Sequence, residues 1–550
     1  MVNLGVDFGS TYTMVSIYEN GEPKTVQPSH LTFNYPSIVC YDSDKDKYFF
    51  GSSAREKLGK KGITGYRGFK MLLNHHMSLE MLKERNYDEK NTPEYITELF
   101  LRHVIENTLK KLNEDKVDLL VIGAPECWFQ SFQTIDARGT LRDICQQFKD
   151  IVNRVELRSE PTNAAAFCVW NFEKKRKEPF DGNILVVDYG GGTLDTALVS
   201  VDHAGEKVQI KPEMLSGIGE NKDKEIGKAG IAYQEAVVRK AISEALKIPE
   251  AEVETNSSFD RAVKEFEDAL VADCDFVDET FEDFAAVPDQ LADENFTSIE
   301  FNGDTVDIDF AQMKRAYNET IYEPLQRVLD ESSAELSADA KPYLALVGGF
   351  CNFYLVREQI QNYFNMGGVN SKVKTLFHKE EDREKAIAYG ACLLANRVMD
   401  VCNVANFGIG MYIKYSDRDQ VFMRYAINFG QEYIPEKIYF ARDKSQAIAP
   451  MMLTEADTFL LNFHKKPEYG FPARPKAKFA DALNKAKHKS IVVVGFSIDG
   501  AERIKVHIFN YDFEASDDRY GTDIPPAATI ALSTFKGSFD NLKVPNAKQL

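Results

Sequence analysis

One stretch of this 550-residue sequence combines acidic, hydroxylic and glycine residues at a spacing that suits phosphate chemistry. An apolar run from Ile184 ends in Asp188, glycines occupy 190–192, and a second apolar run follows Thr193 and Asp195. The pattern predicts a strand, a tight turn and a return strand. Because glycine lacks a Cβ, such a turn can bring several backbone N–H groups close to an oxyanion. The two aspartates could hold a hydrated Mg²⁺ and the threonine could contact a phosphate or a water, although an ordinary glycine-rich hairpin would look the same.

The same pattern stands near the N-terminus, in residues 4–17, which read LGVDFGSTYTMVSI. Asp7 ends an apolar strand, and an aromatic residue, Gly9 and small hydroxylic residues follow before a second strand. The repetition favours two phosphate-binding hairpins on duplicated lobes that face each other across a nucleotide. No Gly-Lys-Ser/Thr sequence occurs, which excludes a P-loop, and no GxGxxG segment follows a strand.

Composition limits what the chain can do. The length predicts three or four structural units, and a hydrophobic content of 44% is enough for large cores. The net charge of −19 disfavours nucleic acids and anionic membranes as partners. Twenty acidic side chains fall within residues 250–309, against only Arg261 and Lys264, which predicts a solvated acidic surface on one subdomain.

The eight cysteines show no CxxC spacing and stand mostly within apolar sequence, as buried thiols do. There is no HExxH and no Cys/His cluster, so we do not expect a structural zinc. Residues 1–20 lack the features of a signal peptide, and no apolar run approaches the length of a membrane span. We therefore expect a soluble, reduced, cytoplasmic protein.

Periodicity and capping residues predict the remaining elements. Helices are expected from Thr92, from Ser159 and over residues 385–395. Strands are expected at 35–41, 117–125 and 344–347, with a Gly-Gly turn at 348–349, a charged turn at 174–179 and a hairpin at Asn302-Gly303. After Val401 the pattern predicts short strands at 421–427, 490–498 and 504–509, and a surface loop at 464–489.

Five of these segments stand in a diagnostic order: first hairpin, small-residue helix, second hairpin, Gly-Gly turn and second small-residue helix. They read DFGSTY at 7–12, EPTNAAA at 160–166, DYGGGTLD at 188–195, VGGF at 347–350 and AIAYGA at 386–391. This wording resembles that of the 70-kilodalton heat-shock chaperones of the DnaK type, within the actin–hexokinase ATPase superfamily. The resemblance spans residues 1–400.

The resemblance implies an α/β two-lobed actin-like ATPase fold, with duplicated ribonuclease H-like domains, followed by a C-terminal mainly-β domain. Lobe I would occupy residues 1–180 and lobe II residues 181–383, with an acidic helical subdomain at 221–310. A helix at 384–400 would return to lobe I. Residues 401–550 would form a β-sandwich-like domain that resembles a truncated peptide-binding domain.

The resemblance also implies roles for individual residues. Asp7 and Asp188 would hold Mg²⁺ through water, Lys70 would help to catalyse hydrolysis, and Glu160 and Asp195 would lie near the attacking water. Such a dispersed set suits phosphoryl transfer, which needs mainly positioning and neutralisation of charge. K⁺ is a further implied ion. ATP or ADP would be bound by Gly9, Ser10, Thr11, Tyr12, Gly190, Gly191, Gly192, Thr193, Gly230, Gly348 and Gly349, with Thr193 and Ser10 at the γ-phosphate.

This chain departs from the family pattern around the base and the interlobe switch. Pro125 matches the switch proline, but its partner arginine falls at Gln133. The adenine usually lies between basic side chains, whereas Asn352 replaces one of them and Glu267 and Asp268 stand at the helical positions. We therefore expect weaker or less adenine-selective binding.

The C-terminal part resembles the family's peptide-binding sandwich only through the hairpin at 496–508. The leucine-rich linker is missing at 399–406, and no helical lid follows before Leu550. A lidless groove should release peptide quickly, and coupling between nucleotide and peptide stays an open question.

The leading functional hypothesis is a slow ATPase of the chaperone type, in which lobe closure changes the affinity for unfolded polypeptide or a dedicated client. Co-chaperones are further expected partners. Three alternatives stay open: an actin-like filament protein, a small-molecule kinase, and a nucleotide sensor without turnover that carries a partner-binding β domain. The acidic region and the β domain speak against a filament, and the intact site residues speak against a sensor.

Overall fold

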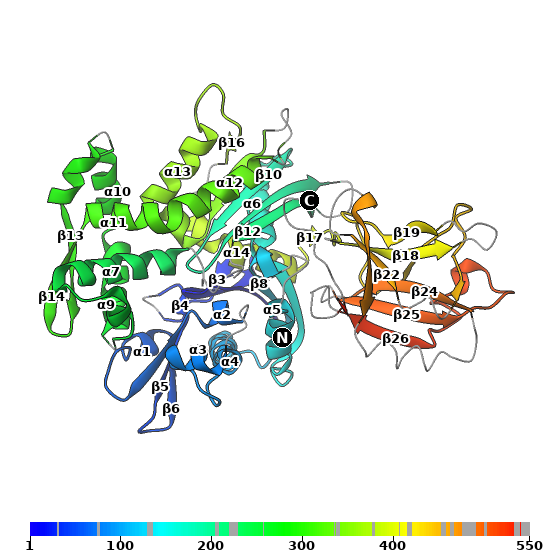
Figure 1. Ribbon diagram of the computed structural model, residues 1–550, viewed down its shortest axis with the longest axis horizontal. Helices are drawn as coiled ribbons and strands as arrows, with labels where there is room; N and C mark the ends of the chain where they lie inside the picture. The colour runs from blue at the N-terminus through cyan, green and yellow to red at the C-terminus, as the bar shows by residue number, and fades with distance from the viewer. Residues whose placement is uncertain are drawn as a thin grey trace. The chain divides into compact units, whose positions relative to one another are not determined.

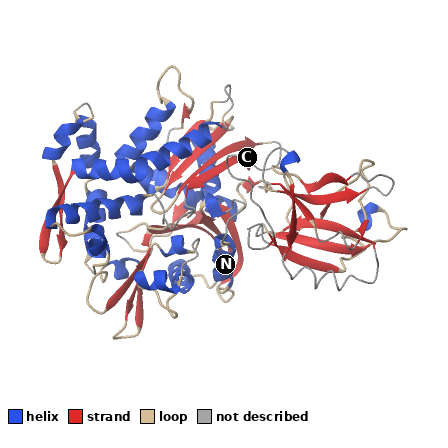
Figure 2. Cartoon of the chain, in the orientation of Figure 1, coloured by secondary structure: helices blue, strands red, loops and turns tan. Residues whose placement is uncertain are grey.

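The computed structural model describes residues 1–29, 32–73, 78–128, 136–203, 208–218, 229–256, 258–285, 287–334, 336, 341–376, 380–405, 407–414, 421–452, 458–462, 467–475, 491–499, 503–532 and 539–540. The chain forms two compact units, the first from residues 1–128 and 140–400 and the second centred on residues 401–550. Helices and strands alternate in the first unit, whereas the second is mainly strands (Figure 2).

The first unit contains a mixed sheet with the strand order β3-β2-β1-β8-β9. Its strands are β1 (Val2–Phe8), β2 (Tyr12–Glu19), β3 (Glu22–Thr25), β8 (Val117–Ala124) and β9 (Val152–Ser159), with β4 (Tyr35–Pro36) paired to β2. β1, β2 and β3 run antiparallel, whereas β8 and β9 are parallel to β1. β8 lies between β1 and β9, which explains its nearly continuous apolar sequence.

A second sheet has six strands in the order β17-β12-β11-β10-β15-β16, and the last five of these repeat the arrangement of the first sheet. Its strands are β10 (Asn183–Tyr189), β11 (Leu194–Asp202), β12 (Gln209–Ile218), β15 (Tyr343–Val347) and β16 (Lys374–Thr375), and β17 (Asp400–Val401) follows late in the chain. Again β10, β11 and β12 run antiparallel, and β15 and β16 are parallel to β10, whose penultimate residue is Asp188. Both predicted hairpins are therefore present, and each occupies the same place in its sheet.

Two helices with small residues pack against each other, one mainly on the first sheet and the other mainly on the second. They are α6 (Glu160–Arg176) and α14 (Glu380–Ala395), and α14 also contacts β1 and β8. A Cβ on Gly390 would lie 1.7 Å from the backbone oxygen of Asn163, so only glycine permits this approach. The sequence pattern thus reflects close helix packing rather than helix propensity alone. The predicted turn at 174–179 is wrong at its start, because α6 continues to Arg176 and ends at Lys177 in a left-handed conformation.

Smaller elements flank the first sheet. The predicted strand at 35–41 is divided into β4 and β5 (Ile38–Asp42), and β5 pairs with β6 (Lys47–Phe50) and β7 (Ile63–Arg67). The helices here are α1 (Gly51–Arg55), α2 (Phe69–Leu72), α3 (Leu79–Glu84), α4 (Pro93–Leu112) and α5 (Ala137–Gln146), with a 3₁₀ turn η1 (Glu126–Trp128). The Thr92 side chain caps α4 by accepting from the Tyr95 N–H at 3.2 Å, as its sequence predicts.

The acidic region after β12 is mostly helical, as expected (Figure 1). It contains α7 (Gly230–Leu246), α8 (Glu250–Glu254), α9 (Phe259–Ala272), α10 (Cys274–Asp283), η2 (Pro288–Asp293) and the hairpin β13 (Asn295–Phe301)–β14 (Asp304–Asp309). Asn302 and Gly303 both have positive φ, of 53° and 94°, which is the turn predicted from their sequence. Further elements of the first unit are α11 (Phe310–Tyr317), η3 (Asn318–Tyr322), α12 (Glu323–Ala334), η4 (Gly349–Asn352) and α13 (Tyr354–Phe364).

The second unit is a sandwich of two sheets, ordered β19-β18-β22-β23-β27 and β20-β24-β25-β26, with β21 also paired to β24. Its elements are β18 (Gly408–Lys414), β19 (Val421–Ile427), β20 (Tyr439–Phe440), β21 (Met451–Met452), β22 (Phe459–Asn462), η5 (Pro467–Tyr469), β23 (Phe471–Pro475), β24 (Ile491–Ile498), β25 (Ile504–Asn510), η6 (Asp517–Arg519), β26 (Ala528–Leu532) and β27 (Phe539–Asp540). Side chains of both sheets share one core, as the packing of Phe459 on Phe496 at 5.4 Å shows.

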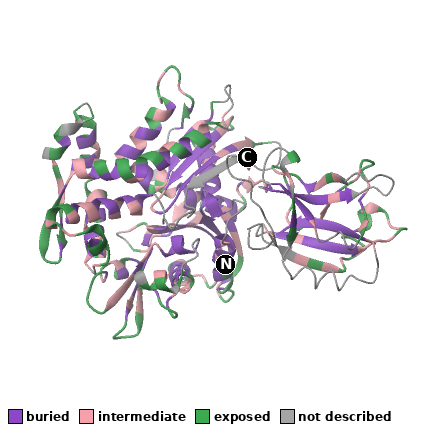
Figure 3. Ribbon diagram, viewed as in Figure 1, coloured by how far each residue is buried: buried purple, intermediate pink, exposed green. Residues whose placement is uncertain are grey.

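The prediction that the chain is mainly β-strand after residue 401 is therefore confirmed, and β26 is a strand that the sequence pattern did not predict. The loop expected at 464–489 is wrong in its described part, because Phe471–Pro475 pairs with β22 and β27 as strand β23; residues 464–466 and 476–489 lie outside the described residues. Each unit has its own buried interior (Figure 3). All eight cysteines are free thiols, and six of them are buried.

Candidate active site

The two hairpins share one register. Phe8 pairs with Thr13 and Tyr189 pairs with Leu194, so the loops are residues 9–12 and 190–193. Next to these pairs, Asp7 stands opposite Met14, whereas Asp188 stands opposite Asp195. The second hairpin therefore carries two carboxylates where the first carries one.

The loops of the two hairpins face each other directly. A Cβ on Gly191 would lie 2.1 Å from the Thr11 hydroxyl oxygen, and one on Gly192 would lie 2.3 Å from that of Ser10. Gly190 and the exposed Gly349 have open space where a Cβ would point. The loop glycines are thus required where the hairpins touch, and they leave exposed backbone where a ligand could approach.

A buried ion pair lies beneath the loops. Lys70, in α2, donates to Glu160 at 2.6 Å, and both side chains are at most 6% exposed. Ser159 caps the helix that begins with Glu160, and the negative carboxylate favours that helix end. Burial lowers the pKa of Lys70, but Glu160, Asp7 and Asp188 together raise it by more, so the pKa is raised overall and the ammonium stays charged.

Three aspartates surround this pair. Burial and then Glu160 raise the pKa of Asp7, which is half-buried, and that of the fully buried Asp195, each to about 7. Burial followed by the charges of Glu160, Asp195 and Asp7 raises the pKa of Asp188 as well. Four carboxylates thus share one ammonium group, and a further cation would relieve their repulsion.

Part of the coordinating capacity of these aspartates is unused. Asp195 Oδ1 accepts from the Cys127 N–H at 3.1 Å, and a Thr193 hydrogen bond also lowers the pKa of Asp195. In contrast, the buried Oδ2 atoms of Asp188 and Asp195 accept no hydrogen bond from any described residue. Buried carboxylate oxygens of this kind fit a hydrated divalent cation, since they accept hydrogen bonds from its water shell. No group of three or more His, Cys, Asp or Glu side chains arranged to hold a metal directly occurs within the described ranges.

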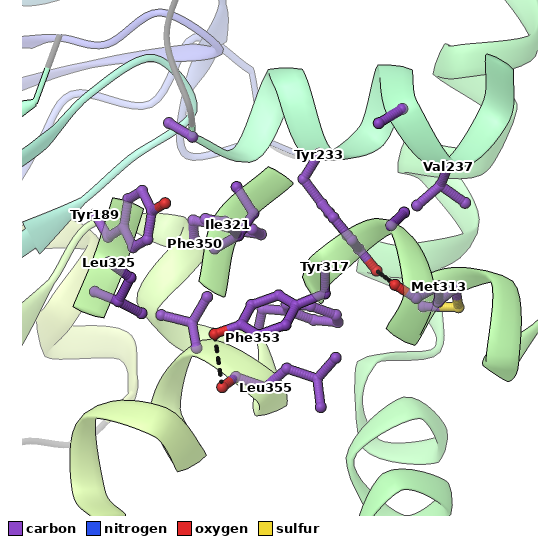
Figure 4. Close-up of a cluster of buried hydrophobic side chains, with 14 of the residues drawn as sticks. Tyr189, Tyr233, Val237, Met313, Tyr317, Ile321, Leu325, Phe350, Phe353 and Leu355 are labelled. Carbon is purple, nitrogen blue, oxygen red and sulfur yellow. Dashed lines mark hydrogen bonds between the residues drawn. The ribbon is translucent and has the colours of Figure 1, made fainter. Parts of the chain in front are cut away.

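The Gly-Gly turn after β15 closes the other side of the second hairpin. Gly348 has a φ of 83°, and a Cβ there would lie 2.6 Å from Asp188 Oδ1. Phe350 then packs on Tyr189, the neighbour of Asp188, with ring centroids 5.0 Å apart (Figure 4). The buried hydroxyls of Tyr233 and Tyr317 donate to backbone oxygens in the same cluster, at 3.4 and 3.1 Å. This core fixes the aspartate and the turn relative to each other.

The start of α7 is attached to the second loop. The Gly230 N–H donates to the Gly190 oxygen at 3.2 Å, and the Ile231 N–H donates to the Gly191 oxygen at 2.8 Å. The first N–H groups of a helix usually lack partners, and here loop carbonyls accept from them. Gly230 therefore positions the loop, while its own N–H is already hydrogen-bonded to the Gly190 oxygen.

An ion-pair network joins α9 to the first hairpin. Arg55 donates to the Tyr12 hydroxyl at 2.6 Å and to Asp268 at 2.5 Å, and its guanidinium lies 3.5 Å from Glu267. Glu267 also accepts from Tyr12 at 3.3 Å. Glu267 and Asp268, which stand where residues that contact the nucleotide base are expected, are thus ion-paired with Arg55.

A second arginine lies beside the Gly-Gly turn. Arg383, in α14, donates to Asn352 Oδ1 at 3.2 Å. Asn352 stands where the family has a basic residue, so a guanidinium reaches this position from another helix. Sequence motifs gave no signal for Arg55 or Arg383, because their partners lie far away in the chain.

The structure therefore brings Asp7, Lys70, Glu160, Asp188, Thr193 and Asp195 into one cluster beneath two facing loops. The predicted backbone positions at 9–12, 190–192, 230 and 348–349 surround it. Pro125 precedes η1, whose Cys127 contacts Asp195, while Gln133 lies outside the described residues. Among the helices described, none is long and apolar enough to cross a membrane.

Comparison with known proteins decides the family. The profile of the family described as "Hsp70 protein" matches residues 3–409. The chain belongs to the Hsp70 family. It is similar to the heat shock cognate 70 kDa protein 3 of Dictyostelium discoideum, with 23% identity over 420 residues. The match covers 72% of this chain and 60% of that protein, so this Hsp70-family chain is a divergent member that spans about 60% of its relative's length.

Proposed function

We propose that this protein binds Mg²⁺·ATP between its two hairpins and hydrolyses it slowly to ADP and phosphate. The observation that carries the proposal is the buried cluster of four carboxylates and Lys70 beneath two facing glycine-rich loops. Membership of the Hsp70 family supports an ATP-dependent chaperone activity in general terms. The repeated strand order supports two lobes with duplicated ribonuclease H-like domains, as in an actin-like ATPase.

Asp7 and Asp188 would hold the metal through its water shell. They are the penultimate residues of β1 and β10, next to the loops, and the buried Oδ2 of Asp188 has no hydrogen-bond donor among the described residues. When bound, Mg²⁺ supplies positive charge to the phosphates and to the carboxylate cluster. K⁺ would be an additional ion, and no contact among the described residues supports a site for it.

The chain's own residues would position the reaction. Loop N–H groups and the Ser10, Thr11 and Thr193 hydroxyls would orient the phosphates, as glycine-rich turns do. Lys70 stays charged through its pair with Glu160 and would stabilise negative charge on the transferred group. Asp195 and Glu160 would orient the attacking water, because both are buried and Glu160 is near enough for its charge to raise the pKa of Asp195.

The base would bind near the Gly-Gly turn and α9. Glu267 and Asp268 are ion-paired with Arg55, so they add little negative charge at this position. Arg383 would supply the cation that position 352 lacks. We retain the prediction of weaker or less adenine-selective binding, because one guanidinium replaces several basic side chains.

The second unit would bind polypeptide. Its two-sheet sandwich supports this role, and the first unit that precedes it belongs to the Hsp70 family by a match over residues 3–409. Unfolded polypeptide or a dedicated client, together with co-chaperones, would be the partners, and lobe closure would change the affinity for them.

Phosphate release from ATP by the purified protein, measured with and without excess unfolded polypeptide, tests this function. We expect slow turnover that polypeptide stimulates and that Thr193→Ala abolishes. A tight nucleotide complex without turnover would instead support a sensor, sedimentable polymer with ATP would support a filament protein, and a phosphorylated small molecule would support a kinase. ADP affinity equal to that of typical family members would refute the altered base site.

A further inference from the structure

The second unit contains a cavity of about 580 Å³ that no motif indicated. It lies between β19 and the segment that runs through β20 into the following loop. Residues that line it are Arg424, Tyr425, Ala426, Lys437, Ile438, Tyr439, Phe440, Arg442, Asp443, Lys444 and Gln446. In a chain of net charge −19, this cavity has four basic side chains and a single carboxylate.

The single carboxylate is already used by its own loop. Asp443 accepts from the Ser445 hydroxyl at 2.6 Å and from the Ser445 and Ala447 N–H groups at 2.7 and 3.1 Å. The hydroxyl contact is the largest cause of its lowered pKa, and Arg424 adds a smaller effect. Arg442 is likewise engaged, with Asp517 at 3.1 Å.

The other cations lie against aromatic rings. The Lys437 ammonium lies 5.5 Å from the Tyr439 ring centroid, and Arg424 and Lys444 lie 5.6 and 4.6 Å from that of Phe422. Within the described ranges, neither Arg424 nor Lys437 has a carboxylate within ion-pair distance. Aromatic contact orders these side chains without neutralising their charge, so the cavity stays electropositive.

The cavity also adjoins two sheet edges. β19 is the end strand of one sheet and β20 the end strand of the other, each with a single neighbour among the described strands of its sheet. An edge strand offers unpaired backbone N–H and C=O groups to an extended polypeptide. A small anion would use the charges alone, whereas a polypeptide would use both the charges and the edge.

We propose that this cavity binds an extended, acidic segment of a client polypeptide, whose aspartate or glutamate side chains pair with Arg424 and Lys437. The inference rests on the proposed polypeptide-binding function of the second unit and names the class of its substrate. Apolar or aromatic residues of the client would lie against Tyr439 and Phe440. The net charge of the protein repels acidic chains at long range, so selectivity would come from short-range pairs in the cavity.

Fluorescence anisotropy with the full chain tests this directly. Three labelled decapeptides of identical length would alternate leucine with glutamate, glutamine or lysine. We expect the glutamate peptide to bind at least about tenfold more tightly than the glutamine peptide, the range for a charge-assisted hydrogen bond. Raising NaCl should weaken binding of the glutamate peptide and leave binding of the uncharged glutamine peptide unchanged.

Charge reversal locates the site. Arg424→Glu and Lys437→Glu should each weaken the glutamate peptide about tenfold or more, because repulsion replaces attraction. Arg519→Glu is the matched control, since Arg519 belongs to the same unit but does not line the cavity, and it should leave affinity unchanged. The salt titration of the unaltered protein keeps the test valid if one variant fails to fold.

Three results would overturn the inference. Equal affinity for the glutamate and glutamine peptides would remove acidic selectivity while leaving the proposed polypeptide binding intact. Displacement of the glutamate peptide by equimolar inorganic phosphate would make the cavity a small-anion site. Failure of all three peptides to bind would overturn both this inference and the proposed function of the second unit.

Discussion

The two hairpins have the same backbone plan but different loop residues. Both have four-residue loops that follow an aspartate and an aromatic residue, at 9–12 and at 190–193. The first loop is rich in hydroxyls, and the second is rich in glycine. The hydroxyl oxygens of Ser10 and Thr11 occupy the space that side chains on Gly192 and Gly191 would need. Each loop's composition is thus explained by the loop that it faces.

The hairpins also differ in charge. Asp195 stands opposite Asp188 in the second hairpin, whereas apolar Met14 takes that place opposite Asp7. The first half of the unit instead contributes Lys70 and Glu160. The two hairpins therefore share a backbone arrangement but differ in their charged side chains. Substitutions at equivalent positions of the two hairpins can test whether this difference matters for activity.

The largest effect is expected from Lys70→Met, which removes the ammonium group of the cluster at nearly constant volume. Glu160 would be left buried and unpaired, which typically costs roughly 3–5 kcal/mol. Phosphate release should fall at least about 100-fold, as for the loss of a group that stabilises transition-state charge. Urea unfolding and ATP turnover measure the two effects separately.

The double variant Lys70→Met/Glu160→Gln separates stability from chemistry. It removes both charges, so unfolding stability should recover most of the loss while turnover stays low. If turnover recovers in the double variant, the buried ion pair is not the centre of the site. The same follows if Lys70→Met alone is as stable as the unaltered protein.

A second prediction uses the matched positions 195 and 14. Asp195→Asn should lower the turnover number about 100-fold or more, as for a group that handles the proton of a reacting water. ADP affinity should change little, because the loops proposed to bind the phosphates are intact. Met14→Leu, at the equivalent place in the first hairpin, should leave turnover within about twofold, since such swaps repack easily. Equal losses in both variants would show that the hairpins do not divide the chemistry.

Sequence patterns predicted those parts of the site that lie close together in the chain. Glycines, strand-terminal aspartates and helix caps act locally, so both hairpins and the start of α6 were predictable. Lys70 could not be selected by spacing, because its significance comes from burial against Glu160, 90 residues away. Its role was suggested only by resemblance.

Long-range partners account for most of what was missed. Arg55 meets Asp268 across 213 residues, and Arg383 meets Asn352 from a different helix. The basic cavity likewise joins β19 to a loop after β20, and no motif connects them. Charge at one position is informative only when its neighbours in space are known.

A third prediction tests the contact between the loops. Gly191→Ala should destabilise the protein by about 1–3 kcal/mol, the usual cost of overpacking, because the new methyl meets the Thr11 hydroxyl. Thr11→Ala in the same chain should restore much of that stability by removing the hydroxyl. Thermal unfolding of both single variants and the double variant gives the coupling. Additive losses would mean that the loops do not face each other.

The smallest expected effect is a pH dependence of stability in the second unit, which contains neither of the two glycine-rich hairpins. His507 is buried, with its ring nitrogens 2.8 Å from the Ser497 hydroxyl and 3.1 Å from the Thr529 hydroxyl. Burial, helped by Lys505, lowers its pKa below the ordinary 6.5. The unfolded chain therefore binds more protons than the folded one as pH falls through 6.5, so stability is present above that pH and declines below it.

Amide hydrogen exchange in β24 and β25 measures this change locally. Between pH 7.5 and 5.5, protection corrected for intrinsic exchange should decrease modestly in the unaltered protein, and less in His507→Gln, which keeps hydrogen-bonding capacity but does not titrate. Gly191→Ala is the matched control from the first unit and should leave the pH effect in these strands unchanged. An equal decrease in His507→Gln would assign the pH dependence to other groups. If Gly191→Ala alters it, the two units are energetically coupled, and the hairpin contact then acts beyond its own unit.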